Sequence, residues 1–210
     1  MKLTLLILLP LATAFPLSLF KRADLTLTTQ NDLLNGTPCK PLTVIFARGT
    51  TSPGNVGEST GPPFFQEIAK LVGAANLAVQ GVTYPASIFG FLGGGDTAGS
   101  KTLAGLVNQA FTQCPSTKVV VSGYSQGGQL VHNAARQLSA AVSAKVSSVV
   151  IFGDPNYGSA VGTIPASKVK VFCHTGDNIC EGGITVTSAH LNYKNDAPAA
   201  AKFVASLAGY

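Results

Sequence analysis

Hydrophobic residues follow two alternating patterns along this chain. Continuously apolar, largely β-branched stretches are typical of strands that are buried on both faces of a sheet. They occupy residues 42–47, 77–82, 118–122, 147–152 and 168–172. Elsewhere, apolar residues recur three and four positions apart, which predicts amphipathic helices. The clearest of these cover residues 62–72, 101–111, 126–141 and 196–207. Strands that alternate with helices predict an α/β fold, with a doubly wound parallel sheet and helices on both faces.

Proline, glycine and aspartate mark the ends of two of these helices. Pro62 opens the first helix and Gly73 ends it. Asp196 is predicted as the N-cap of the last helix, with Pro198 inside its first turn. The glycine-rich stretch 84–96 is predicted as a loop.

The loops of the sheet predict where a functional site would lie. In parallel α/β sheets, active sites lie outside the carboxyl ends of the strands. The loops after residues 47, 82, 122, 152 and 172 are therefore expected to converge on one edge.

The N-terminal segment has the features of a secretory signal peptide. Lys2 precedes a short apolar run that ends at Ala12-Thr13-Ala14, a small-residue cleavage pattern. The run is too short to cross a bilayer as a helix, so a membrane anchor is the less favoured alternative. Lys21-Arg22 is either the end of a short pro-segment or a solvated pair of charges. These features predict that residues 1–22 are a leader and that the protein is secreted and extracellular.

Composition and charge narrow the class of protein further. A chain of 210 residues favours one domain, here residues 23–210. The formal net charge falls from +5 to +2 without residues 1–22. The remaining chain has no basic patch, so no nucleic-acid partner is expected. No Cys or His spacing is typical of zinc, and no cofactor, metal or transmembrane segment is expected. We expect the domain to act as a monomer.

The four cysteines predict two disulfides in a secreted chain. Three pairings are open, and proximity in sequence favours Cys173 with Cys180, which leaves Cys39 with Cys114. Loop entropy predicts that the longer bridge stabilises the fold by about 4 kcal/mol. Asn35 begins a glycosylation sequon, although Pro38 directly after it leaves its use open.

The stretch Gly123-Tyr124-Ser125-Gln126-Gly127 matches G-x-S-x-G, between a predicted strand and a predicted helix. A nucleophilic serine on this sharp turn has a strained backbone, and side chains two positions before and after it would collide with neighbouring elements. The helix N-terminus favours a developing negative charge. A glycine-rich packing turn is the alternative, and the strand–turn–helix context favours the nucleophile.

A reactive serine needs a base, and the chain has three histidines. His132 lies seven residues after Ser125 on the same predicted helix, about 10 Å along its axis, so it is excluded as the base. It is expected to be a surface or core histidine instead. His174 directly follows the last predicted strand, and His190 lies beyond all strands. In hydrolases with a serine on such a sharp turn, the catalytic residues follow one another along the chain as serine, acid and histidine, which selects His190. The alternative for His190 is a solvated histidine in a loop.

The acid of such a triad must lie between the serine and the histidine. Asp177 lies inside the predicted Cys173–Cys180 loop, which would fix its position. Asp154 also follows a strand, and its alternative role is to cap the turn there. Glu181 is expected to face solvent. The chain pattern gives Asp177 only a modest edge over Asp154.

Four motifs together resemble the cutinase family, small secreted serine esterases that include the cutinases and related acetylxylan esterases. They are residues 47–57, 123–128, 152–158 and 173–193. The resemblance spans about residues 39–208 in the family's order. It implies a lidless α/β-hydrolase with a five-stranded parallel sheet. For Arg48 it suggests a structural role, to which a plain surface charge is the equal alternative.

The resemblance also implies roles for single residues. By position, Ser125 is the nucleophile, Asp177 the orienting acid and His190 the base of acyl transfer. The oxyanion hole falls at Thr50 and Gln126, where the family often has serine instead of Thr50. The resemblance supports the same two cysteine pairs.

Apolar residues on two segments suggest where the substrate binds. They are Ile88, Phe89, Phe91 and Leu92 on one segment, and Ile184, Val186 and Leu191 beside the histidine. These two apolar segments would contact a water-insoluble ester. For Phe89 and Phe91, burial in the protein core is the equal alternative. We therefore expect a serine esterase that hydrolyses cutin or similar aliphatic polyesters and short-to-medium acyl esters. Tyr84-Pro85-Ala86 looks more like the acetylxylan esterases, which keeps removal of acetyl groups from polysaccharide as an alternative. A non-catalytic secreted binding protein is the remote one.

Overall fold

The computed structural model describes residues 24–210, and the predicted leader 1–22 lies outside the described residues. Five parallel strands form one sheet in the order β2-β1-β3-β4-β5. They are β1 (Leu42–Ala47), β2 (Leu77–Gly81), β3 (Lys118–Tyr124), β4 (Ser148–Phe152) and β5 (Val169–Phe172). Each lies within two residues of a predicted strand.

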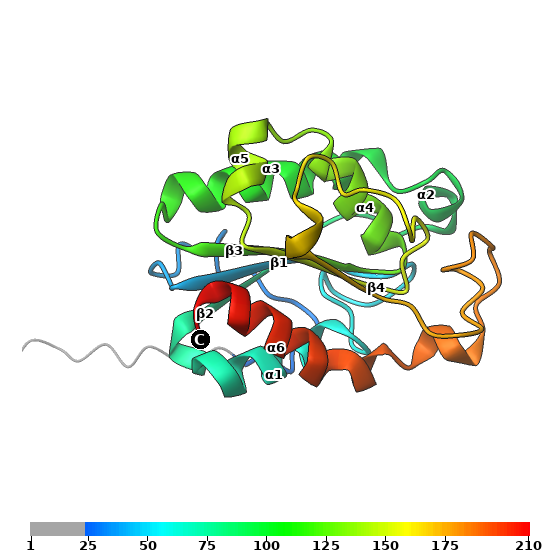
Figure 1. Cartoon of the computed structure of the whole chain (residues 1–210), viewed down its shortest axis with the longest axis horizontal. Coiled ribbons are helices and arrows are strands. Elements are labelled where there is room, and N and C mark those ends of the chain that lie inside the picture. Colours follow the sequence, from blue (N-terminus) through cyan, green and yellow to red (C-terminus); the bar gives the residue numbers. More distant parts are fainter. Residues whose placement is uncertain (1–23) are drawn as a thin grey trace, which may run out of the picture.

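Helices cover both faces of this sheet, as the hydrophobic pattern predicts. On one face lie α3 (Thr97–Gln113), α4 (Gln126–Ala135) and α5 (Ala140–Lys145), and on the other lie α1 (Gly61–Val72) and α6 (Ala197–Ala208) (Figure 1). A further short helix, α2, spans Ile88–Leu92. The 3-10 turns are η1 (Ala74–Asn76), η2 (Ala166–Lys168), η3 (Ser188–Leu191) and η4 (Tyr193–Asp196).

The core divides into two layers because successive side chains of a strand point to opposite faces. On β1, Leu42, Val44 and Phe46 pack toward α1 and α6, whereas Ile45 and Ala47 pack toward α3 and α4. All five are fully buried. Burial on both faces accounts for the continuously apolar strands.

Two local predictions need correction, and a third, the N-cap at Asp196, is confirmed in position but not in contact. The helix predicted for residues 126–141 is two helices, because the chain turns after Ala135 and the Ser139 hydroxyl accepts a hydrogen bond from Val142 N to start α5. The predicted loop 84–96 contains α2, whose first turn is capped by Ser87. Asp196 occupies the N-cap position of α6, but its carboxylate caps no backbone N–H and contacts His174 instead.

Arg48 has a structural role and is not a surface charge. Its side chain is buried and donates hydrogen bonds to the carbonyl oxygens of Ser52 (2.7 Å) and Tyr84 (2.8 Å). It also lies over the ring of Tyr84, at 4.8 Å from the ring centre. Arg48 therefore ties the loop after β1 to the loop after β2.

Both predicted disulfides are present, Cys39–Cys114 and Cys173–Cys180. The first joins the segment before β1 to the end of α3, and the second closes a short loop after β5. No helix among residues 24–210 has the length and apolar character that crossing a bilayer requires.

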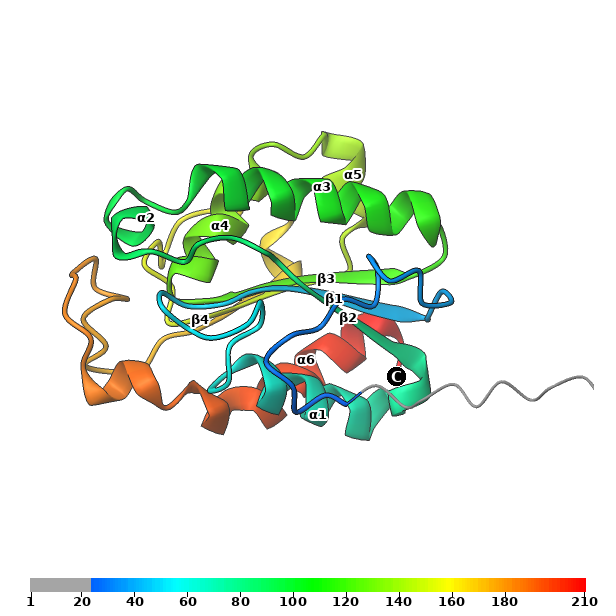
Figure 2. The same ribbon diagram turned by 180° about the vertical axis from the view of Figure 1, so that it is seen from behind.

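The loops at the carboxyl ends of the strands gather at one end of the molecule. In both views, α2 and the segment after β5 lie at this same end, away from the C-terminus (Figures 1 and 2). The sheet thus brings together segments that are about 100 residues apart in the chain.

The two disulfides are expected to differ in their effect on stability. Removal of Cys39–Cys114, in the double variant Cys39→Ser/Cys114→Ser, should lower the free energy of unfolding by about 4 kcal/mol, because the bridge closes a long loop of the unfolded chain. Removal of Cys173–Cys180 should cost only about 2 kcal/mol, because the loop is short. Urea unfolding measures both values. Equal losses for the two pairs would contradict the loop-entropy explanation.

Candidate active site

Ser125 lies on a strained turn between β3 and α4. Its backbone has φ 57° and ψ −122°, a conformation that residues other than glycine rarely adopt and that costs about 1–3 kcal/mol. A Cβ at Gly123 would lie 2.3 Å from the Gly127 carbonyl oxygen, and a Cβ at Gly127 would lie 2.0 Å from that of Ala47. The two glycines of the motif are therefore sterically required. Ser125 N donates a hydrogen bond to the Phe152 carbonyl (2.9 Å), which ties the turn to β4.

His190 and Asp177 form a buried hydrogen-bonded pair. His190 Nδ1 lies 2.8 Å from Asp177 Oδ2, and both side chains are almost completely buried. The Cys173–Cys180 disulfide closes the loop that carries Asp177, and Ile179 N donates a further hydrogen bond to Asp177 Oδ1 (3.0 Å). His190 Nε2 is buried and has no hydrogen-bond partner within residues 24–210. The imidazole is thus held at one nitrogen only.

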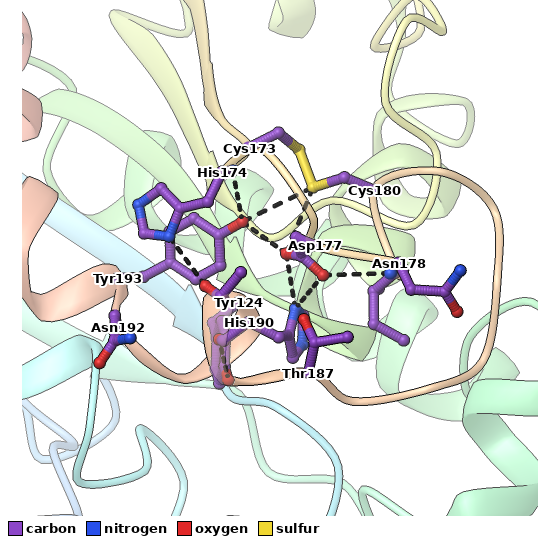
Figure 3. A network of polar contacts seen from close by, with 12 residues as sticks. Tyr124, Cys173, His174, Asp177, Asn178, Cys180, Thr187, His190, Asn192 and Tyr193 are labelled. Atoms are coloured by element: carbon purple, nitrogen blue, oxygen red, sulfur yellow. Dashed lines mark hydrogen bonds and ion pairs between the residues drawn. A yellow bond between two sulfur atoms is a disulfide. The ribbon is translucent and has the colours of Figure 1, made fainter.

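Two tyrosines hold this pair in place. Tyr193 OH donates to Asp177 Oδ2 (2.5 Å) and accepts from His174 N (3.1 Å). Tyr124 OH donates to the His190 carbonyl (2.9 Å), and its ring stacks on the His190 ring with centres 5.1 Å apart. Figure 3 shows these contacts around Asp177. The sequence analysis missed both tyrosines, although Tyr124 adjoins the serine and Tyr193 follows His190 by three residues.

The same contacts shift the pKa values of the groups involved. Burial alone would raise the pKa of Asp177, but the hydrogen bonds from Tyr193 and His190 outweigh burial and hold it below 3.8. Burial, and then the nearby Asp177 charge, raises the pKa of Tyr124 to about 12. Burial and the hydrogen bond to Asp177 raise the pKa of Tyr193. Asp177 is therefore ionised and both tyrosines are neutral at neutral pH.

The alternative acids lie in other environments. Asp154 Oδ2 lies 2.9 Å from His132 Nε2, both fully buried, and Asp154 Oδ1 accepts a hydrogen bond from Asn156 N. Asp154 thus has the turn-capping role that was its alternative, and His132 is a core histidine. Glu181 is exposed, as predicted.

Gly153, at φ 57°, packs so closely that a Cβ there would lie 2.7 Å from His190 Cε1.

Thr50 and Gln126 are joined by a side-chain hydrogen bond. Gln126 Nε2 donates to Thr50 Oγ1 (2.8 Å) and to the Ser87 carbonyl (2.8 Å). Because the Thr50 oxygen accepts this bond, its own O–H is free to donate elsewhere. Gln126 also begins α4, whose first backbone N–H groups have no partner within the helix.

A cavity of about 540 Å³ lies over Ser125 and His190. Five of the seven predicted substrate-binding residues line it: Ile88, Phe91, Ile184, Val186 and Leu191. Phe89 and Leu92 do not line it, and Phe89 is 87% exposed. Exposure of Phe89 excludes the core-filling alternative for that residue, whereas Phe91 is half-buried in the cavity wall.

Another part of the cavity lining, here called the polar wall, carries polar side chains, and of its residues only Thr50 was predicted as part of the site. It is formed by Thr50, Thr51, Ser52, Glu58 and Ser59. No group of three or more His, Cys, Asp or Glu side chains that could hold a metal ion occurs in the described part of the chain.

Comparisons with known proteins identify the family. The cutinase family model matches residues 38–208. The chain belongs to the cutinase family. Cutinase pbc1 of Pyrenopeziza brassicae is 55% identical over 170 residues, which cover 81% of this chain and 84% of that protein. Trichoderma reesei cutinase, solved with a phosphonate inhibitor, has a TM-score of 0.83 and 46% identity, over 88% of this chain and 82% of its own.

Membership of the cutinase family confirms the predicted enzyme class, a serine-type carboxylic ester hydrolase with an α/β-hydrolase fold. The catalytic core domain of an acetyl xylan esterase from Trichoderma reesei matches with a TM-score of 0.63 over 80% of this chain and 98% of its own. At 22% identity, this match shows the shared fold alone.

We expect Tyr193→Phe to lower stability at neutral pH and to make it less dependent on acid. The pKa of Asp177 is lower in the folded than in the unfolded protein, so its stabilising effect is present above pH 3.8 and is lost as the pH falls through the folded pKa. Loss of the tyrosine hydroxyl raises the folded pKa toward the unfolded value, so the variant has less of this stabilisation at neutral pH and loses less of it in acid. Urea unfolding at neutral pH should show a deficit of about 2 kcal/mol, the value of a hydrogen bond to a charged group.

This deficit should shrink below pH 4, where Asp177 takes up a proton in both proteins. Tyr157→Phe, at an exposed tyrosine, is the control and should leave stability unchanged. A deficit that stays constant between pH 3 and 7 would show that Tyr193 acts by packing alone.

Proposed function

We propose that this cutinase-family protein is an extracellular esterase in which Ser125 is the nucleophile, His190 the base and Asp177 the orienting acid. One observation carries the proposal. His190 is fixed through Nδ1 to a buried carboxylate, while its unpartnered Nε2 belongs to a ring that lines the same cavity as Ser125. A general base for a serine hydroxyl needs this arrangement. Residues of one chain supply all three groups, which agrees with a monomer.

Acyl transfer then proceeds in two halves. His190 Nε2 takes the proton of the Ser125 hydroxyl as Ser125 Oγ attacks the ester carbonyl, and the resulting imidazolium gives this proton to the leaving alcohol. Water then attacks the acyl-enzyme with His190 again as base, and the acid product and free Ser125 result. Ionised Asp177 stabilises the imidazolium in both halves. In the neutral ring it fixes the tautomer that carries its proton on Nδ1.

The oxyanion that forms during both attacks is stabilised next to Thr50 and Gln126. The backbone N–H groups of these two residues are the proposed donors, and the N-terminus of α4 adds a favourable dipole. The Gln126 side chain occupies the Thr50 oxygen as acceptor, so the Thr50 hydroxyl can give a third hydrogen bond. Removal of one such donor typically costs about 10²–10³ in rate.

The substrate class follows from the two walls of the cavity. Five predicted apolar side chains in the cavity lining suit an aliphatic acyl chain, and α2, which supplies two of them, also exposes Phe89 and Leu92 to solvent. An exposed apolar surface of this kind is suited to a water-insoluble partner. We propose aliphatic polyesters such as cutin, and short-to-medium acyl esters, as substrates, in agreement with the cutinase names of the relatives. The signal-peptide features of residues 1–22 support an extracellular location.

Removal of acetyl groups from polysaccharide is the second candidate. The polar wall around Glu58 and Ser59 is the observation that favours it, because a sugar would need hydroxyl partners there. Rates on p-nitrophenyl acetate, butyrate and octanoate distinguish the two. A sharp preference for acetate would favour the deacetylase.

Substitution of the proposed triad should abolish hydrolysis without unfolding the protein. We expect Ser125→Ala, His190→Ala and Asp177→Asn each to lower kcat on p-nitrophenyl butyrate by about 10⁴-fold or more. Ser206→Ala, at an exposed serine on α6 outside the cavity lining, is the control and should retain activity. A Ser125→Ala protein with more than a tenth of the wild-type rate would rule out the proposed nucleophile.

The exposed apolar surface should matter only for insoluble substrates. Phe89→Ser removes a large apolar side chain that is 87% exposed and lies outside the cavity lining. We expect hydrolysis of an aliphatic polyester film to fall about tenfold, because roughly 1.5 kcal/mol or more of apolar contact with the solid is lost. Hydrolysis of p-nitrophenyl acetate should not change.

Leu71→Ser is the matched control, because Leu71 is an exposed apolar residue on α1 outside the cavity lining. An equal loss on the film for both variants, or a loss on the soluble ester for Phe89→Ser, would contradict a role for α2 in binding solids.

A further inference from the structure

A third histidine–aspartate pair, besides His190–Asp177 and His132–Asp154, contacts the residue next to His190. His174 Nε2 lies 2.6 Å from Asp196 Oδ2, and His174 Nδ1 lies 2.8 Å from the Ala189 carbonyl oxygen. Ala189 is the residue before His190, and Asp196 stands at the start of α6. The pair therefore connects the last helix to the segment that carries the proposed base. Figure 3 shows His174 beside Tyr193, and their rings are stacked with centres 4.2 Å apart.

The geometry determines the protonation state of His174. A backbone carbonyl and a carboxylate only accept hydrogen bonds, and each faces one ring nitrogen. Both contacts are hydrogen bonds at the same time only when both nitrogens carry a proton, so this arrangement favours the imidazolium. Burial alone would lower the pKa of His174, but the Ala189 carbonyl and the Asp196 carboxylate outweigh burial and raise it above 6.5.

We propose that His174 is a positioning residue for catalysis, whose imidazolium holds the Ala189 carbonyl and thereby fixes the orientation of the His190 ring. The inference rests on the role of His190 proposed above. His174 reaches the site by two further contacts: its backbone N–H donates to Tyr193 OH, which in turn donates to Asp177. The carbonyl on one side of His190 and the carboxylate at its Nδ1 are thus both linked to His174, the first through its charged ring and the second through its backbone N–H.

Loss of the proton from His174 would release one of these links. A neutral imidazole has one N–H and keeps it toward the stronger acceptor, the Asp196 carboxylate, so the Ala189 carbonyl would face a lone pair. The titratable groups that act on His174 are Asp196 from the start of α6, Asp177 from the disulfide loop and Tyr193, stacked on its ring. The two carboxylates favour the charged form.

The sign of the pH dependence follows from the raised pKa. A histidine with a higher pKa in the folded than in the unfolded protein stabilises the fold fully below its unfolded pKa, about 6.5. That stabilisation is lost as the pH rises through the folded pKa. We expect kcat to fall over the same range, because the His190 ring loses its support, while KM for a soluble ester stays constant.

Asp196→Asn tests the inference. The amide keeps the shape of the Asp196 side chain but removes the charge, and an opposite charge in contact typically shifts a pKa by about 1–3 units. We expect the alkaline fall of kcat on p-nitrophenyl butyrate to move to lower pH by that amount, with KM unchanged. The pKa of His174, read from its ring-proton NMR signals, should move by the same amount.

His174→Arg provides the complementary variant, because a guanidinium donates to both acceptors and keeps its charge at every pH in use. It should keep kcat near the wild-type value at neutral pH and lack the alkaline fall. Glu67→Gln is the control, because it also removes a carboxylate charge, from the exposed Lys70–Glu67 pair on α1. It should leave the pH profile unchanged.

Several results would overturn the inference. They are an Asp196→Asn profile that matches the wild type, a pKa of His174 that does not move, an equal shift in Glu67→Gln, or a change in KM alone. If Asp196→Asn fails to fold, His174→Arg decides, and an unaltered alkaline fall in that variant rejects the proposal. Activity retained in Ser125→Ala or His190→Ala would instead reject the proposed triad. Inactive triad variants together with a normal Asp196→Asn profile reject only the role of His174.

Discussion

The buried carboxylate of Asp177 is the constraint on which the architecture around the site depends. An ionised carboxylate without contact to water is costly unless hydrogen bonds replace its hydration. His190, Tyr193 and the backbone N–H of Ile179 supply these bonds, and the disulfide loop fixes the carboxylate between them. Removal of any one partner leaves a charge that is buried and less well compensated. The position of His190 is therefore set by the hydrogen bonds that the buried Asp177 carboxylate needs as much as by the packing of the histidine ring.

The strained turn at Ser125 depends on the sheet in a similar way. A positive φ at a serine persists only where the surrounding structure leaves no alternative. Here the backbone of β1 and the start of α4 close in on Gly127 and Gly123, and the hydrogen bond to Phe152 ties the turn to β4. Two well-packed layers around a fully buried strand give these elements the rigidity to hold the turn. Stability of the core and reactivity of the serine are thus linked through three backbone segments.

Much of this arrangement could be predicted from sequence, because its signals are local. Continuous apolar runs predict the strands, and two glycines around a serine predict the sharp turn that carries Ser125. The break after Ala135 could not be predicted, because the helical spacing of apolar residues continues across it. That Ser139 caps a new helix is visible only in the structure. Nor could residues alone separate Asp177 from Asp154, since both follow strands. Their separation comes from partners distant in sequence, His190 for one and His132 for the other. Tyr193 and His174 act through equally distant contacts, which periodicity and spacing do not reveal.

Close packing at Gly153 limits how this protein can vary. A methyl group there would overlap both His190 and Tyr193, each at 2.7 Å, and the backbone has a conformation that favours glycine. Every substitution at this position must displace the imidazole or the tyrosine that holds its carboxylate partner. Gly158 and Gly176 also have a positive φ but lie in open space, so a replacement there would strain the backbone without meeting a neighbouring side chain. Two glycines only five residues apart therefore differ in what a side chain would disturb: at Gly153 it would strain the backbone and displace the imidazole or its tyrosine neighbour, and at Gly158 it would strain the backbone alone.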